Sequence, residues 1–366
     1  MNQYHFSCTA TWSDGPPSDI PETEDEALAH IDKLYDAGVP FFTKDMIRSA
    51  LKQIQRPLKN GDKVYLKDLN GATVAYQIKL GDIGDLREKD GIDEELEYVL
   101  TDTVLQYNCR ADMRHSIFWH YDPKKPYLCP LAINNSAVIR DKVTKKIIPW
   151  EAAPRDEVFS YFQKDLEAWN DTKMCANVKR ILNSAAKNLE ITKVVAVSLD
   201  SVSRDRDWDR EYQQEGRSAY QHGLALTLRD WVKEKNSGSD VPCFVQDPAY
   251  LDTDKDVLTA HGFKVIDDPH AWLEIDDFSI VVSISSNVPT REMIADISRP
   301  AVVIWNVVKD EDYDQRDKMS MTDPCSRRVR AMLKGYDCYD FGATMSHFGD
   351  VVIYVRQPKT LCQEGT

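Results

Sequence analysis

Residues 193–203 read KVVAVSLDSVS and begin the stretch that decides the fold. They are followed by a charged run, RDRDWDREYQQEG (204–216), by the amphipathic segment RSAYQHGLALTLRDWV (217–232) and by PCFVQDP (242–248). A buried strand, a polar loop, a long helix and a second strand form a parallel β-α-β crossover. The stretch from Lys193 to Asp247 therefore predicts an α/β fold.

The sequence downstream repeats this alternation of strand and helix. Strands are expected at residues 194–199, 243–246, 264–266, 279–285, 301–307 and 350–356, and helices at 211–235, 254–261, 290–297 and 324–333. Two further amphipathic helices lie between Pro154 and Asn188. Strands separated by helices predict a doubly wound, mostly parallel, Rossmann-like sheet with helices on both faces. We assign residues 151–357 to this domain and 358–366 to a loose tail.

The first 150 residues have a different pattern. Residues 1–24 are rich in Ser, Thr, Pro and acids and are interpreted as a mobile arm. Residues 25–150 are expected to form an α+β flanking region. It begins with two helices near 23–38 and 43–55 and continues with a hairpin around Asn70-Gly71. Short strands are expected at 101–107, 117–119, 137–139 and 147–150.

Composition limits the classes of function. The net charge of −14 argues against nucleic acid or an anionic membrane as the main partner. The N-terminus lacks a secretory signal pattern, and no run of 18 apolar residues predicts a membrane span. The eight cysteines never form CxxC, which favours reduced thiols in a cytoplasmic or nuclear protein. No metal site is predicted, since His115, His120 and Asp122 match no standard spacing.

Candidate binding residues follow from the rule that ligands of open α/β sheets lie beyond the carboxyl ends of the strands. The residues selected are Asp200, Ser201, Asp247, Ser285 and Asn287, together with Tyr220 and Gln221 on the following helix. Asp200 and Asp247 could orient a ligand, and Ser285 and Asn287 could donate hydrogen bonds. Each also has a structural interpretation as a turn residue or helix cap.

Several catalytic patterns are missing from the sequence. No glycine lies between Lys193 and Gly216, so the Gly-x-Gly-x-x-Gly cradle for a pyrophosphate is absent from the first turn. No Gly-x-Ser-x-Gly elbow occurs either. His222 and His261 are expected to be solvated or capping residues. Residues 204–210 form either a solvated loop or a lid over the strand ends.

The segments VVAVSLDSVS, SAYQHGLALTLRDWV, VQDPAYLDTDKDVLTAHGFKVI and FSIVVSISSNVP resemble the sensitivity-to-red-light-reduced domain family, and its fungal branch in particular. The resemblance covers roughly residues 155–310. Ala219-Tyr220-Gln221, Asp247-Pro248 and His261-Gly262 stand at family motifs. The family's Gly-Leu-Gly-Ser element is replaced by Ser198-Leu199-Asp200-Ser201, which lacks both glycines.

The resemblance implies a regulatory protein, because the family is linked to circadian regulation and to control of haem biosynthesis. No cofactor follows from it, and the partner is either a small ligand or a protein. The alternatives left open by the residues are an enzyme, such as a Rossmann-like transferase or hydrolase using the strand-end crevice, and an interaction module that uses residues 25–150.

Overall fold

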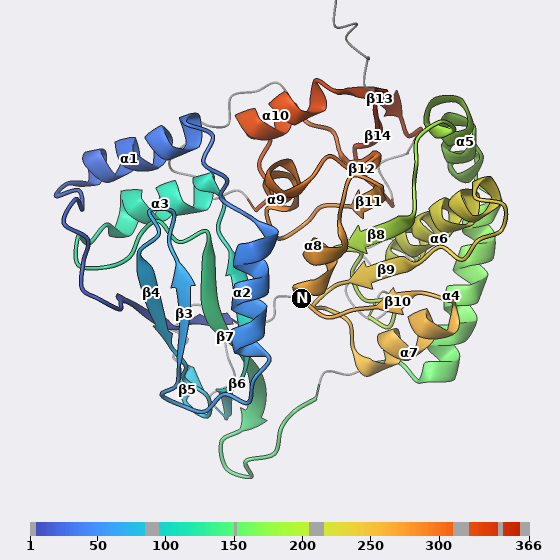
Figure 1. Cartoon of the computed structure of the whole chain (residues 1–366). Helices are drawn as coiled ribbons and strands as arrows, with labels where there is room; N and C mark the ends of the chain where they lie inside the picture. The colour runs from blue at the N-terminus through green and yellow to red at the C-terminus, as the bar shows by residue number, and fades with distance from the viewer. Residues whose placement is uncertain are drawn as a thin grey trace, which may run out of the picture. The chain divides into compact units, whose positions relative to one another are not determined.

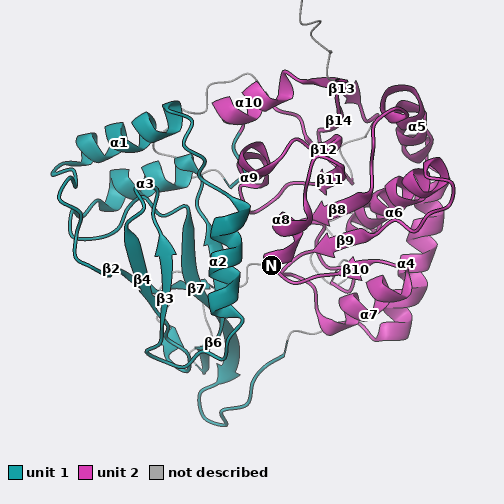
Figure 2. Cartoon of the chain, in the orientation of Figure 1, with its two compact units in different colours: residues 1–151, 313–324 teal, residues 152–312, 325–366 magenta. Residues whose placement is uncertain are grey.

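A computed structural model describes residues 5–84, 95–149, 152–204, 216–309, 322–342 and 347–358. The chain divides into two compact units (Figure 2). Unit 1 consists of residues 1–151 and 313–324, and unit 2 consists of residues 152–312 and 325–366.

Unit 1 contains two antiparallel sheets and three helices among the described residues. One sheet has the order β1-β7-β6-β5 and the other the order β2-β4-β3. The strands are β1 (His5–Ser7), β2 (Thr9–Trp12), β3 (Lys63–Lys67), β4 (Thr73–Gln77), β5 (Ile83–Gly84), β6 (Leu96–Tyr107) and β7 (Leu131–Asp141). The helices are α1 (Glu24–Asp36), α2 (Lys44–Ile54) and α3 (Arg110–His120). The first two helices and the β3–β4 hairpin are as predicted.

One prediction in unit 1 is wrong, and another region differs from expectation. Residues 117–119, expected as a strand, belong to α3, in which Met113 and Ile117 are buried four residues apart. Two arginines of α3 pair with Asp32 of α1, which fixes this helix through contacts distant in sequence. Residues 5–12, expected within a mobile arm, form β1 and β2, because both strands pair with later strands.

Unit 2 is built on a seven-stranded sheet, counted over the described residues. Its order is β10-β9-β8-β11-β12-β14-β13, and all its strands are parallel except β14. The strands are β8 (Lys193–Val197), β9 (Cys243–Gln246), β10 (Lys264–Val265), β11 (Ser279–Ser283), β12 (Val302–Asn306), β13 (Tyr336–Asp340) and β14 (Val351–Arg356). The α/β class and the mostly parallel, doubly wound sheet are thereby confirmed.

Helices cover both faces of this sheet (Figure 1). One face carries α4 (Arg155–Asn170), α5 (Lys173–Ile181), the π-helix η1 (Leu182–Ala186), α6 (Arg217–Lys235) and α7 (Asp252–Ala260). The other carries α8 (His270–Glu274), α9 (Thr290–Ile297) and α10 (Arg327–Leu333). Because α6 leads from β8 to β9 on one side and α8 leads to β11 on the other, the switch point lies between β8 and β11.

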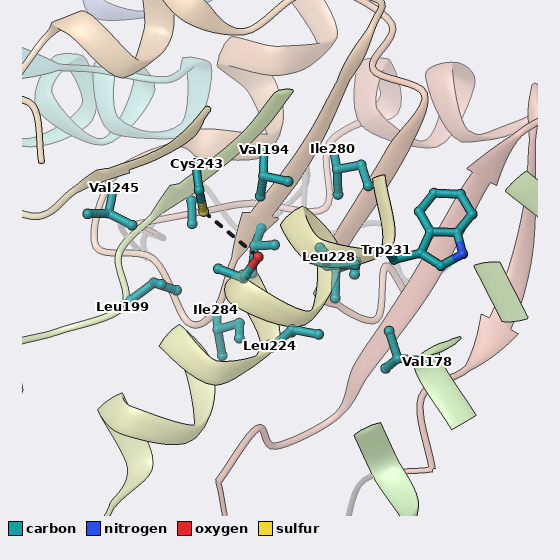
Figure 3. Close-up of a cluster of buried hydrophobic side chains, with 14 of the residues drawn as sticks. Val178, Val194, Leu199, Leu224, Leu228, Trp231, Cys243, Val245, Ile280 and Ile284 are labelled. Carbon is teal, nitrogen blue, oxygen red and sulfur yellow. Dashed lines mark hydrogen bonds between the residues drawn. The ribbon is translucent and has the colours of Figure 1, made fainter. Parts of the chain in front are cut away.

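The main core lies between the sheet and α4–α6 (Figure 3). Leu224 and Leu228 of α6 belong to the same buried cluster as Val194 of β8 and Ile280 of β11. All four side chains are fully buried. The spacing of four residues in the helix and the alternation in the strands place these side chains on facing surfaces. Burial of each stabilises the fold by about 1.5–3 kcal/mol.

Three elements of unit 2 differ from the prediction. The strand β13 and the short helix α8 were not predicted, since β13 is mostly polar and α8 spans five residues. The helix expected from Pro324 begins at Arg327, where the Ser326 hydroxyl accepts a hydrogen bond from the Val329 amide. The first residues of the long helix, 211–215, and most of the tail lie outside the described residues. No described helix is long and apolar enough to cross a membrane.

The α4–α6 contact gives a first prediction. A Cβ atom added to Gly223 would lie 2.7 Å from Cδ1 of Trp169, a fully buried side chain. Gly223→Ala should therefore lower the free energy of unfolding by about 1–3 kcal/mol, measured by urea denaturation. Gly335→Ala is the matched control, because its nearest contact would be the Met332 carbonyl oxygen at 3.6 Å. Equal stabilities for the two variants would contradict the contact.

Candidate functional site

The turn after β8 has an unusual backbone. Ser198 and Asp200 have φ angles of 60° and 64°, in the left-handed region. Glycine adopts this region freely, whereas other residues do so at a cost of about 1–2 kcal/mol. These are the two positions at which the Gly-Leu-Gly-Ser motif has its glycines. The chain therefore adopts a glycine-type turn without glycine.

Asp247, at the end of β9, is bonded to this turn. One carboxylate oxygen accepts a hydrogen bond from the Asp200 backbone N–H at 2.8 Å, and the other accepts from the Ala249 N–H at 2.8 Å. Burial raises the pKa of Asp247 to about 6, an effect that the two amide bonds oppose and the nearby Asp200 and Asp254 reinforce. The turn thus holds a carboxylate of its own chain where a phosphate cradle would hold an anion.

Ser201 is buried and is bonded to Asp254 of α7. Its hydroxyl donates to Oδ2 of Asp254 at 2.8 Å, and the Ser203 backbone N–H donates to Oδ1 at 2.7 Å. Asp254, which is fully buried, also accepts from the Leu251 N–H at 2.7 Å. Asp254 is not among the residues predicted from the sequence, because an acid in the first turn of a helix ordinarily indicates only capping.

The next connection leads to α6. The Ser218 hydroxyl donates to the Asp200 carbonyl oxygen at 2.9 Å. His222 lies within hydrogen-bonding distance of the Ser218 carbonyl at 2.8 Å and of the Tyr250 hydroxyl at 2.8 Å. It is fully buried, and burial lowers its pKa to about 4. The expectation that His222 is solvated or capping is wrong, because one face of α6 packs inside the core.

Tyr220 and Gln221 form a separate group. The Tyr220 ring stacks on the His347 ring, with centroids 4.2 Å apart and planes 8° from parallel. The Gln221 side-chain amide donates to the His347 carbonyl oxygen at 2.9 Å. Both residues therefore attach α6 to the segment that precedes β14, and neither contacts Asp247 in the bonds described here.

Ser285 and Asn287 lie in a third group, after β11. The Ser285 backbone N–H donates to Oδ1 of Asn306 at 2.8 Å, and Ser285 has a left-handed φ of 53°. Asn287 is exposed. Between this group and the β8 turn, the hydroxyls of Ser198 and Ser286 lie 2.9 Å apart and join the two sides of the switch point.

The seven selected residues thus fall into three groups: Asp200, Ser201 and Asp247 at the β8 turn, Tyr220 and Gln221 on α6, and Ser285 and Asn287 after β11. The two cavities described in the structure border α6 and lie elsewhere. Of the suggested lid over residues 204–210, only Arg204 belongs to the described residues. Within the described part of the chain, no three His, Cys, Asp or Glu side chains are grouped as metal ligands.

The family model of the SRR1 domain matches residues 163–355, a span that extends into β14. No curated protein matches the sequence. Among solved structures, a proposed O-methyltransferase from Klebsiella pneumoniae is similar, with a TM-score of 0.31 and 10% identity over 58% of this chain and 92% of that one.

The backbone of Ser285 gives a second prediction. Ser285→Gly should raise the free energy of unfolding by up to about 1 kcal/mol, because glycine relieves the left-handed strain and the hydrogen bond to Asn306 uses the backbone N–H. Ser285→Val should lower it, since a β-branched residue is strained there. Asn287→Gly is the control and should only destabilise, because Asn287 is not among the residues with positive φ. A loss of stability in Ser285→Gly would refute the assignment of strain.

Asp247 gives a third prediction. With a pKa of about 6, the folded protein keeps a proton that the unfolded chain releases above about pH 4. Asp247 therefore reduces stability as pH rises from about 4 through 6, by at most about 3 kcal/mol. Relative to wild type, Asp247→Asn should gain stability between pH 4.5 and pH 7.5 in urea denaturation. The exposed Asp256 supplies the control variant Asp256→Asn. If the difference in free energy of unfolding between wild type and Asp247→Asn does not change with pH, this titration of Asp247 is excluded.

Proposed function

Because the chain belongs to the SRR1 domain family, we propose that it is a regulatory protein that acts by binding rather than by catalysis. One observation carries the proposal: the Asp247 carboxylate occupies the turn after β8, and both of its oxygens accept backbone N–H bonds. The residues that furnish a ligand site in other doubly wound sheets serve here to join β8, β9 and α6.

Two of the other candidate side chains support the same interpretation. The Ser201 hydroxyl donates to Asp254, and the Gln221 amide donates to the His347 carbonyl. A general acid or base must reach the proton that it transfers, at about 2.6–3.2 Å. Side chains committed to such structural bonds would have to break them first.

The finer parts of the proposal rest on the resemblance of the sequence. They are a role in circadian regulation or in control of haem biosynthesis, membership of the fungal branch, and a location in the cytoplasm or nucleus. The seven selected residues, with Asp247 first, remain the proposed ligand-contacting set if a ligand binds at the strand ends.

A second candidate is an enzyme with a ribose-bearing cofactor, and the position and pKa of Asp247 favour it. Asp247 ends the strand next to β8 at the carboxyl edge, where an acidic residue binds the ribose hydroxyls in Rossmann folds. A carboxyl group with a pKa of about 6 also suits proton transfer near neutral pH. This function requires Asp247 to leave the Asp200 amide.

A thermal-shift panel distinguishes the two candidates. We expect no rise in Tm with ATP, NAD or S-adenosylmethionine at a concentration of about 1 mM. A ligand present at about 100 times its Kd would stabilise the protein by about 2.7 kcal/mol and shift Tm by several degrees. Haem is included to test the link implied by the resemblance.

The variants decide which site is responsible for any shift. A rise that Asp247→Ala abolishes and Asp256→Asn retains would favour the enzyme and contradict a purely regulatory role. If Tm does not rise with any nucleotide, the strand ends bind none of these cofactors in this affinity range. That result would support the regulatory proposal.

A further inference from the structure

His261 joins the end of α7 to α4. It is the C-cap residue of α7, and its side chain is half-buried. Nδ1 lies 2.7 Å from the carbonyl oxygen of Val257, and Nε2 lies 3.2 Å from Oε1 of Gln163 in α4. Both neighbours are oxygen atoms that accept hydrogen bonds and cannot donate them. A neutral imidazole has one N–H group and can bond to only one of them, whereas an imidazolium donates to both.

The orientation of the Gln163 amide is fixed by Glu167. Nε2 of Gln163 donates to Oε1 of Glu167 at 2.9 Å. If the oxygen and the nitrogen of the amide changed places, two oxygen atoms would face each other at Glu167, because a carboxylate only accepts. Oε1 is therefore the atom that Gln163 presents to His261, and a hydrogen bond there needs a proton on Nε2 of the imidazole.

His222 shows the opposite case. Its Nδ1 also lies beside a carbonyl oxygen, that of Ser218, but its Nε2 lies beside the hydroxyl of Tyr250. A hydroxyl can donate as well as accept, so the neutral ring satisfies both contacts. The neutral form is also the one that burial favours, because burial lowers the pKa of His222 to about 4. The two histidines thus differ in the number of protons that their partners require.

The surroundings of the His261 ring accommodate a positive charge. A residue at the C-terminus of a helix lies where the partial negative charge of the free carbonyl groups favours a cation. The ring centroid is 4.6 Å from that of Phe159, with the planes tilted by 36°, and 4.9 Å from that of Phe162. The Phe159 ring lies within the range at which an aromatic face attracts a cation.

Charged groups of α4, α6 and β10 lie around this contact. They are Arg155 and Glu167 of α4, Arg229 and Asp230 of α6, and Lys264 of β10. Arg229 approaches the backbone carbonyl of His261, with Nη1 at 3.4 Å, and is paired with Asp230 at 2.7 Å. Among the residues that the structure describes, no ion pair reaches the ring nitrogens of His261. The proton on Nε2 therefore serves the bond to Gln163.

The two helices that meet at His261 also hold the turn after β8. The Tyr161 hydroxyl of α4 donates to the carbonyl oxygen of Val202 at 3.0 Å. From the other side, Asp254 of α7 accepts hydrogen bonds from Ser201 and Ser203. Residues 201–203 are thereby held between α4 and α7, and the contact at His261 links the same two helices directly.

We propose that His261 is a proton-dependent link between α7 and α4, which closes when the ring is protonated and opens when the ring loses that proton. Histidine suits this role, since imidazoles change charge near neutral pH. The link stabilises the fold when the ring is charged, and this contribution is lost as pH rises. His261 is thus a positioning residue for the turn after β8, and the inference holds whether or not a ligand binds at the strand ends.

A double-mutant cycle measures the link. His261→Phe keeps an aromatic ring beside Phe159, and Gln163→Met keeps the length of the side chain without its amide. From urea denaturation of the full-length protein, we expect the two substitutions to be coupled by a factor of about three to ten in the unfolding equilibrium constant at about pH 5.5, and by less than about 1.5 at about pH 8. Ser160→Ala is the control partner, because the exposed Ser160 hydroxyl bonds only within α4, to the Asp156 carbonyl; it should show no coupling to His261→Phe at either pH.

Two measurements on the wild-type protein follow the proton itself. In ¹⁵N-labelled protein, the side-chain amide of Gln163 should shift with the same midpoint as the ring nitrogens of His261, the two being assigned with Gln163→Met and His261→Phe. In hydrogen exchange, the protection factor of the Ser203 N–H should fall between about pH 5.5 and about pH 8 by about threefold more in wild type than in His261→Phe.

Four results would overturn the proposal. Equal coupling at the two pH values would show that the contact does not require the proton, and no coupling at either would show that these side chains do not link the helices. A Gln163 amide that does not follow the titration of His261 would exclude the link even if a variant failed to fold. Equal changes in Ser203 protection in wild type and His261→Phe would separate the link from the turn. None of these results alters the outcome of the nucleotide panel.

Discussion

The hydrogen bond from the Asp200 amide to the Asp247 carboxylate is the contact on which the carboxyl edge of unit 2 depends. It joins the turn after β8 to the end of β9 next to it in the sheet. The carbonyl of the same Asp200 accepts a bond from Ser218 and so fixes the start of α6. One peptide region therefore positions two strands and the crossover helix, and its left-handed backbone is maintained by these bonds in spite of its cost.

Two titratable groups beside this contact act in opposite directions. Asp247 keeps a proton in the folded state up to about pH 6, so its charge destabilises the fold as pH rises. His222, whose pKa is lowered to about 4, excludes a proton that the unfolded chain binds below about pH 6.5, so it destabilises the fold as pH falls. The two contributions oppose each other between about pH 4 and 6. A half-buried carboxyl and a buried imidazole in one network thus reduce the pH dependence that either would cause alone.

The parallel sheet was predictable because β8, β11 and β12 are nearly continuous apolar runs. A strand needs apolar side chains on both of its sides only when both faces of its sheet are covered. Elements defined by distant contacts were not predictable. The helix α3 depends on arginines that pair with Asp32, and β13 is a polar edge strand recognisable only from its pairing with β14. At the strand ends, the sequence identified the residue types but not their partners. Asp254 and Tyr250 are buried there by contacts with Ser201 and His222, which are distant in sequence and leave no local pattern.

The turn after β8 shows why a resemblance in sequence predicts the fold of a domain better than it predicts the chemistry of its site. Glycines at 198 and 200 would allow the turn without strain. Serine and aspartate adopt the left-handed backbone here and add side chains that glycine lacks: the Ser198 hydroxyl lies beside Ser286, and the Asp200 carboxylate accepts from the Ser201 N–H. The bond from the Asp200 N–H to Asp247 uses the backbone and would form with either residue, so the substitutions change the side chains of the turn and not this contact. Since function depends on the chemical groups at a site rather than on the fold, a binding role of this domain must be tested on the side chains that it presents to solvent.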